Sequence, residues 1–133
     1  MRELDRWETV HTVNDFYDAP RRGVADLDGV PHVYSWIDRF EAYALAPIGP
    51  APLAAILEAW AIWERWEAAH RAGTLTSADQ HPALAIDRPR HDALAPLVAR
   101  GLMADGGRLF HGEFRGATRP MALEVRWSPF SNT

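Results

Sequence analysis

The sequence predicts an α+β fold, in which an antiparallel sheet or partly open barrel packs on one long central helix and on shorter helices. Three observations predict it. Segments with alternating or β-branched apolar residues lie near both ends of the chain, so the sheet is expected to combine N- and C-terminal strands. An Asp-Gly pair separates two such segments. A long segment without glycine or proline lies between the two ends.

The N-terminal segment is expected to contain a short strand followed by turns. Residues 9–13 (Thr-Val-His-Thr-Val) are rich in β-branched side chains and predict a strand. Asn14 and Asp15 follow, and both residue types favour turns, so the strand is expected to end there. Residues 19–23 (Ala-Pro-Arg-Arg-Gly) predict a second turn.

A hairpin is the strongest local prediction for the next segment. Residues 23–27 and 30–37 flank Asp28 and Gly29. A type I′ turn needs positive φ at both central residues, and Asp-Gly tolerates this better than most pairs. Residues 43–48 predict one further strand before a proline-rich stretch.

The central segment predicts a long helix. Pro52 suits a first helical turn, residues 53–71 contain neither glycine nor proline, and Gly73 is placed to end the helix. At 100° per residue, a broad apolar arc forms on this helix, which predicts burial against more than one neighbour. Its members are Leu53, Ile56, Leu57, Ala59, Trp60, Ile62, Trp63 and Trp66.

A shorter helix is expected to run to about Arg100. Asp87 or Asp92 could cap its N-terminus. Pro96 is tolerated near a helix start but disrupts an interior, so the later beginning is favoured.

The last third predicts two more strands. Residues 108–115 alternate, with Phe110 and Phe114 on one face. Residues 121–127 alternate as well, and their inward positions are expected to be Met121, Leu123, Val125 and Trp127.

Composition excludes several classes of protein and site. The 133 residues fit one domain, expected over residues 1–133, and the net charge of −4 gives no attraction to phosphate backbones, so nucleic acid is not an expected partner. The charged N-terminus and the interrupted apolar segments predict a cytoplasmic protein with no membrane association. Because cysteine and lysine are absent, thiolate metal sites, Schiff-base chemistry and a Walker-type phosphate loop are excluded. No cofactor is expected.

Two sequence strings carry a resemblance. The first is N-D-F-Y-D-A-P-R-R-G-V-A-D followed by G-x-P-H-x-Y, over residues 14–34; the second is A-W-A-I-W-x-R-W-E-A over residues 59–68, with H-P-A-L at 81–84. Together they resemble a group of short uncharacterised bacterial proteins. That group has no assigned activity, so the resemblance implies a bacterial source but no mechanism.

The candidate ligand site lies in the predicted turn over residues 14–22 and in the hairpin that follows. Paired guanidinium groups can hold a phosphate or carboxylate, and a nearby histidine or carboxylate could move a proton. The alternative interpretation is a plain turn with arginine–carboxylate ion pairs on its surface. The candidate residues are Asp15, Tyr17, Arg21, Arg22, His32 and Glu67.

Glu67 is included because the central helix contains a polar stripe. Glu64, Glu67 and His70 are spaced by three residues and lie near its apolar arc. Glu-x-x-His is a ligand unit of helical-bundle metal sites, but those sites draw ligands from four helices, so no metal is predicted. A buried or rim ion pair is favoured, with Arg21 or Arg22 as the partner.

These observations favour a non-catalytic module that binds a small ligand or a protein. Its partners would be an anionic small molecule, a second copy of the chain or another protein, the latter two through exposed aromatic surface. The alternative is a small enzyme that acts on an anionic small molecule with an Arg/His/Glu site, in which Glu64 or Glu67 is the general base. Whether the protein is an enzyme stays open from sequence.

Overall fold

The structure is a computed structural model that describes residues 6–103, 107–118 and 121–131. The chain divides into two compact units. Met1–Ile48 together with Leu102–Thr133 form the barrel unit, and Gly49–Gly101 form the helical unit. The two units are described separately, and the prediction of a single domain stays a prediction.

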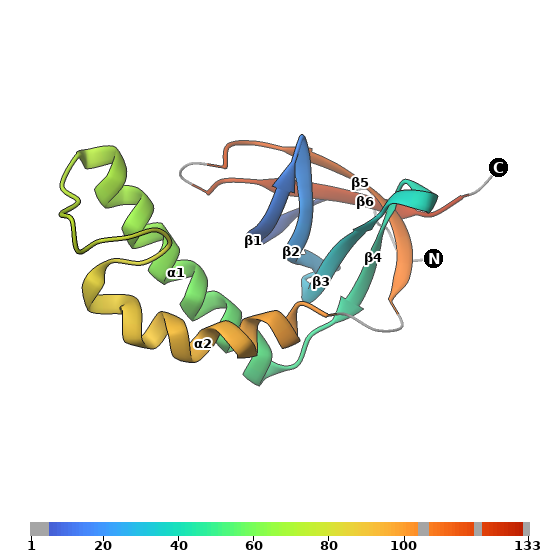
Figure 1. Cartoon of the computed structure of the whole chain (residues 1–133). Coiled ribbons are helices and arrows are strands. Elements are labelled where there is room, and N and C mark those ends of the chain that lie inside the picture. The colour runs from blue at the N-terminus through green and yellow to red at the C-terminus, as the bar shows by residue number, and fades with distance from the viewer. Residues whose placement is uncertain (1–5, 104–106, 119–120, 132–133) are drawn as a thin grey trace. The chain divides into compact units, whose positions relative to one another are not determined.

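The barrel unit is a closed antiparallel barrel. Its strands pair in sequence order from β1 to β6, and β6 pairs back onto β1 (Figure 1). The α+β class and a barrel are therefore confirmed, but the barrel is closed rather than partly open, and packing on one long central helix is not confirmed. In the described residues the strands are β1 (Trp7–Tyr17), β2 (Ala19–Leu27), β3 (Val30–Ile37), β4 (Ala42–Pro47), β5 (Arg108–Arg115) and β6 (Glu124–Pro129), with a 3₁₀ turn η1 (Asp38–Phe40) before β4.

The hairpin between β2 and β3 forms as predicted. Asp28 and Gly29 have φ of 57° and 75°, as a type I′ turn requires. The buried carboxylate of Glu8 accepts hydrogen bonds from both turn N–H groups, at 2.5 and 2.8 Å. This carboxylate, supplied by β1, therefore fixes the turn from the neighbouring strand.

The predicted turns before this hairpin are wrong. β1 does not end at Asn14 and Asp15 but continues to Tyr17, and the chain reverses at Asp18, where φ is 63°. Residues 19–23 belong to β2 rather than to a turn. Two irregularities in the β1–β2 register fall within this stretch. Such bulges accommodate turn-forming residues inside a strand, and pairing with β2 overrides their local preference.

The C-terminal strands confirm the predicted alternation. β5 has the predicted bounds, and Phe110 is 3% exposed. β6 begins later than predicted, at Glu124, but Leu123, Val125 and Trp127 are buried as expected. Inward positions thus follow every second residue of both strands.

Aromatic side chains fill the middle of the barrel. The rings of Tyr34, Tyr43, Phe114 and Trp127 lie within 5.5–6.2 Å of one another by centroid distance. Three of them also donate their polar hydrogen to a backbone carbonyl, which avoids a buried unpaired donor. These hydrogen bonds join Tyr34 to Thr12 (2.9 Å), Tyr43 to Pro20 (2.6 Å) and Trp127 to Asp26 (3.0 Å).

Gly23 makes the first of these hydrogen bonds possible. A Cβ atom at this position would lie 2.2 Å from the Thr12 carbonyl oxygen and 2.7 Å from the Tyr34 hydroxyl. The backbone of β1 therefore approaches β2 too closely for any side chain there.

The helical unit contains α1 (Pro50–Ala72), a 3₁₀ turn η2 (Ala85–Asp87) and α2 (Arg88–Gly101). As predicted, α1 ends at Gly73, which has φ of 71°. The most deeply buried side chains of the two helices are Ile56 and Ile62 of α1 and Leu94 of α2, each at most 1% exposed.

The favoured late start of α2 is wrong. The helix begins at Arg88, and Pro96 lies inside it. Pro89 occupies its second position, where proline suits a first turn, and Pro96 lies on an exposed part of the helix. A bidentate pair from Arg65 of α1 to Asp87, with both distances 2.9 Å, also fixes the chain just before this start. That hydrogen bonding lowers the pKa of the Asp87 carboxyl.

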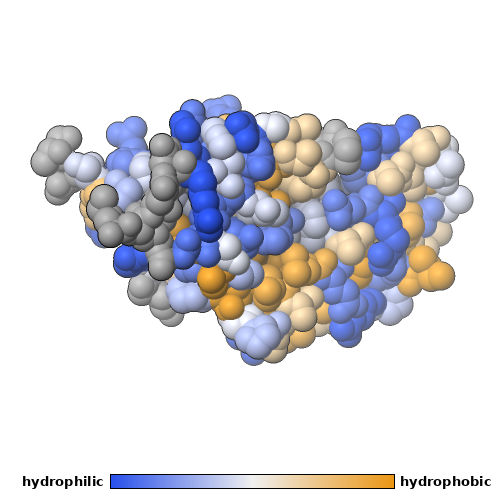
Figure 2. Space-filling model, turned by 180° about the vertical axis from the view of Figure 1, so that it is seen from behind, coloured by the Kyte–Doolittle hydropathy of each residue, from blue (hydrophilic) through white to orange (hydrophobic). Residues whose placement is uncertain are grey.

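Both polar and apolar residues reach the surface. Figure 2 shows orange and blue residues interspersed over one face. In the helical unit the large exposed apolar side chains include Leu57, Ile86 and Leu97. No helix within the described ranges is long and apolar enough to cross a membrane.

We expect Gly23→Ala to destabilise the barrel by about 2–3 kcal/mol, because the new methyl group overlaps the Thr12 carbonyl.

Tyr34→Phe should lower the free energy of unfolding by less, about 1–2 kcal/mol, because it removes one buried hydrogen bond and keeps the ring. Urea unfolding followed by tryptophan fluorescence measures both. Equal stability of Gly23→Ala and the parent chain would contradict the close approach described above.

The buried phenols predict a loss of stability at high pH. Burial raises the pKa of Tyr43 from 10.0 to about 12, against a smaller lowering by the charge of Arg21, and burial also raises the pKa of Tyr34. A raised pKa stabilises the fold below the ordinary value, and this contribution is lost as the pH rises from 10 towards 12.

Thermal melts across this pH range should show the decline, and Tyr43→Phe should reduce it. Tyr17→Phe serves as the comparison, because Tyr17 is 69% exposed. An identical decline in Tyr43→Phe and in the parent chain would exclude Tyr43 as its source.

Candidate ligand-binding site

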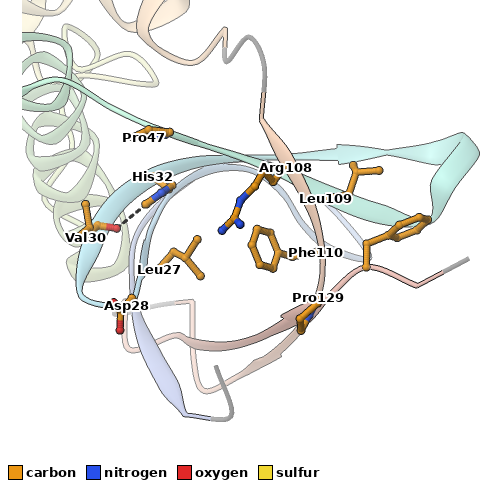
Figure 3. A pocket seen from close by; sticks show the side chains of 10 residues that line it. Leu27, Asp28, Val30, His32, Pro47, Arg108, Leu109, Phe110 and Pro129 are labelled. Atoms are coloured by element: carbon orange, nitrogen blue, oxygen red, sulfur yellow. Dashed lines mark hydrogen bonds between the residues drawn. The ribbon is translucent and has the colours of Figure 1, made fainter. Parts of the chain in front are cut away.

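One end of the barrel interior is hollow. The cavity has a volume of about 720 Å³, and all its lining residues belong to the barrel unit. Most of them continue the inward positions of the strands beyond the aromatic core, so the cavity is the unfilled end of the barrel itself (Figure 3). These inward residues are Leu27, His32, Pro47, Arg108, Phe110 and Pro129.

Arg108 places a charge in this cavity. Figure 3 shows its guanidinium group extending across the barrel opening beside Phe110, and the guanidinium carbon lies 5.1 Å from the centroid of that ring. Among the described residues no carboxylate lies within ion-pair distance of Arg108. The ring contact orients the guanidinium but does not neutralise it.

Sequence reasoning missed Arg108, although a signal was present. Arg108 lies two residues before Phe110, so the alternation that places Phe110 inward places Arg108 inward as well. The other inward positions of this strand are Phe110, Gly112 and Phe114, and an arginine in such a row indicates either an ion pair or a ligand site.

His32 is the second polar group of the cavity. Its Nδ1 lies 2.7 Å from the Val30 carbonyl oxygen, drawn as a dashed line in Figure 3. Because a carbonyl only accepts, Nδ1 carries the proton, and Nε2 of the neutral ring is an acceptor. No described residue bonds to Nε2, so that atom is available to a ligand.

The rest of the lining is apolar apart from Asp28. Leu27, Phe110, Pro129 and Phe130 contribute hydrocarbon surface to the cavity. The carboxylate of Asp28 lies 3.1 Å from the guanidinium of Arg6, which also lies 3.7 Å from the carboxylate of Glu8. The cavity therefore combines an apolar wall with a guanidinium, Arg108, that has no carboxylate within ion-pair distance among the described residues.

The other predicted site residues of the barrel unit lie towards its opposite end. Arg21 stacks over the rings of Tyr17 and Trp36, at 5.6 and 5.2 Å, and its guanidinium lies 3.4 Å from Asp38. The guanidinium of Arg21 is therefore held by aromatic rings and a carboxylate of the protein itself, as in the alternative interpretation of a plain turn with surface ion pairs.

Arg22 and Asp15 face each other in the register of β1 and β2. The Nε atom of Arg22 donates a hydrogen bond to the Ser35 hydroxyl at 3.0 Å. Ser35 lies three residues beyond His32 on β3, or about 10 Å at 3.3 Å per residue. The structure thus separates His32 from the predicted arginine pair.

Glu67 belongs to the helical unit, where it is 6% exposed. Its carboxylate lies 3.3 Å from Nε of Arg71, one helical turn further along α1. Glu67 therefore has an ion pair within its own helix, whereas the prediction gave Arg21 or Arg22 as its partner. His70, the next member of the predicted stripe, stacks on Trp66 with the ring centroids 5.0 Å apart.

Within the described ranges, no three His, Asp or Glu side chains come together as a metal-binding group. Comparisons with protein-family models, curated proteins and solved structures gave no match. The geometry of the cavity is therefore the basis on which a function is inferred for this chain.

The His32 hydrogen bond predicts the less common Nδ1–H tautomer for its neutral ring. Long-range ¹H–¹⁵N spectra at alkaline pH distinguish the two ring nitrogens directly. His70, for which no side-chain hydrogen bond is recorded among the described residues, provides the comparison. Observation of the Nε2–H form at His32 would show that the contact with Val30 does not hold the ring.

Proposed function

We propose that the protein is a non-catalytic module that binds a small molecule with an anionic group and an apolar body. The observation that carries the proposal is the exposed side chain of Arg108, which lines a largely apolar, open cavity and has no carboxylate partner among the described residues. A guanidinium in such surroundings binds a carboxylate or phosphate through charge-assisted hydrogen bonds. Nε2 of His32 supplies a further polar contact.

The dimensions and lining of the cavity support this ligand class. Small-molecule sites commonly enclose about 300–1,000 Å³, and they combine apolar walls with a few polar groups. The volume of about 720 Å³ lies in that range. Leu27 and Phe110 would contact the apolar body, while Arg108 would hold the anion.

Binding is favoured over catalysis by the residues that line the cavity. They include no serine, threonine, tyrosine or lysine. The polar groups of the lining are His32, Arg108 and Asp28. Glu64 and Glu67, the general bases of the alternative small enzyme, are not among the residues that line this cavity.

Three six-carbon probes test the proposal: hexanoate, hexyl phosphate and the neutral analogue hexanol. We expect the two anions to bind more tightly than hexanol, and Arg108→Gln to weaken their binding by about tenfold or more while leaving hexanol unaffected. Isothermal titration calorimetry measures the affinities.

Arg39→Gln is the control, since Arg39 stacks over Phe40 at 4.7 Å but does not line the cavity. Its anion affinity should equal that of the parent chain. Equal affinities for hexanoate and hexanol, or no effect of Arg108→Gln, would refute the proposed role of Arg108.

A further inference from the structure

The opposite end of the barrel holds a second hollow. Its volume is about 480 Å³, and it too lies wholly within the barrel unit. Inward positions of β3, β4 and β5 form its base, and two of them, Tyr43 and Phe114, also belong to the central aromatic cluster. Those positions are Trp36, Tyr43, Gly112 and Phe114.

Aromatic rings form much of its wall. The centroids of Trp36 and Tyr43 lie 5.0 Å apart with the ring planes at 69°, and Tyr43 lies 5.6 Å from Phe114. Phe16, from the end of β1, completes the wall and is 55% exposed. This wall offers π-electron surface to whatever occupies the hollow.

Asp18 contributes a carboxylate to the same hollow. It lies at the reversal between β1 and β2, and no described residue bonds to its side chain or forms an ion pair with it. Positive φ at this residue fixes the direction in which the side chain leaves the backbone.

The nearby arginines are already paired. Arg115 lines the hollow, but its guanidinium lies 2.9 Å from Glu124 and 3.9 Å from the centroid of the Trp7 ring. Arg21, whose charge reaches Tyr43, is paired with Asp38. Among the described residues, the uncompensated charge at this hollow is therefore negative.

We propose that this hollow is a second binding site and that it takes a small organic cation of the methylated-ammonium class. Such cations bind to the faces of aromatic rings, and a nearby carboxylate adds charge attraction. The ring of Trp36 already contacts the guanidinium of Arg21 at 5.2 Å, so Phe16 and Phe114, which have no such contact among the described residues, supply the ring surface for the ligand. A metal ion fits less well, because one carboxylate falls short of the oxygen ligands that hard cations require.

Choline tests the proposal against its neutral isostere, 3,3-dimethylbutan-1-ol. NMR titration at constant ionic strength should show saturable shifts of the Trp36 and Phe114 ring resonances with choline and none with the alcohol. Asp18→Asn should weaken choline binding by about fivefold or more, and asparagine tolerates the left-handed backbone there. Phe16→Ala should weaken binding too.

Asp15→Asn is the matched control, because Asp15 is an exposed carboxylate of the same hairpin that does not line the hollow. It should leave choline affinity unchanged. Equal binding of choline and the alcohol, an absence of saturable shifts, or equal losses in Asp18→Asn and Asp15→Asn would each overturn the proposal.

Arg108→Gln separates this proposal from the anion site at the other end of the barrel. The variant should bind choline as the parent chain does while losing affinity for hexanoate. Loss of choline binding in Arg108→Gln would show that the two ends are not independent sites, and would overturn the second-site proposal alone.

Discussion

The buried hydrogen bond from the Tyr34 hydroxyl to the Thr12 carbonyl is the constraint on which the barrel depends. The register of β1 shifts beside Thr12, and such a shift frees a carbonyl from the ladder and allows it to turn inward. The carbonyl can reach Tyr34 only because Gly23 has no side chain between them. The Thr12 hydroxyl accepts a hydrogen bond from the Val24 N–H, so both oxygens of Thr12 are paired. Loss of the Tyr34 hydroxyl or of the Thr12 hydroxyl would therefore leave a buried backbone polar group without its hydrogen bond.

This arrangement divides the barrel interior into three zones. Aromatic rings occupy the middle, where polar hydrogens and backbone carbonyls satisfy one another. Beyond them, the same inward positions face open space at either end. The two ends differ in chemistry, because one contains Arg108 and His32, while the other contains aromatic rings and Asp18. A single alternating pattern along each strand thus produces both the core and the two candidate sites.

Local chemistry made part of the fold predictable. The Asp28-Gly29 turn, the bounds of β3 and β5 and the end of α1 all follow from short sequence patterns. The continuation of β1 past Asn14 did not, because a bulge is stabilised by the partner strand rather than by its own residues.

The site was less predictable for a similar reason. Arg21 and Arg22 are adjacent in sequence and could together bind an anion. In the structure, however, Arg22 donates a hydrogen bond to Ser35 of β3, and Arg21 forms an ion pair with Asp38 of η1. His32 does line the cavity, but its neighbour there is Arg108, which lies far along the chain. Such a juxtaposition arises only when the barrel closes, so spacing along the sequence gives no measure of it. The alternation of β5, which places Arg108 on the same face as Phe110, was the sequence pattern that could have identified Arg108.

The insertion of the helical unit between β4 and β5 has a consequence for how the chain folds. Strands β1 to β4 pair as successive neighbours in sequence, whereas β4 and β5 are separated by the whole of residues 48–107. Closing so long a loop costs more entropy than closing a tight turn, so this pairing and the β6–β1 seam are expected to form late. During synthesis, the segments of β1 to β4 and of both helices leave the ribosome before those of β5 and β6. The hollow ends of the barrel therefore exist only once β6 has paired with β1.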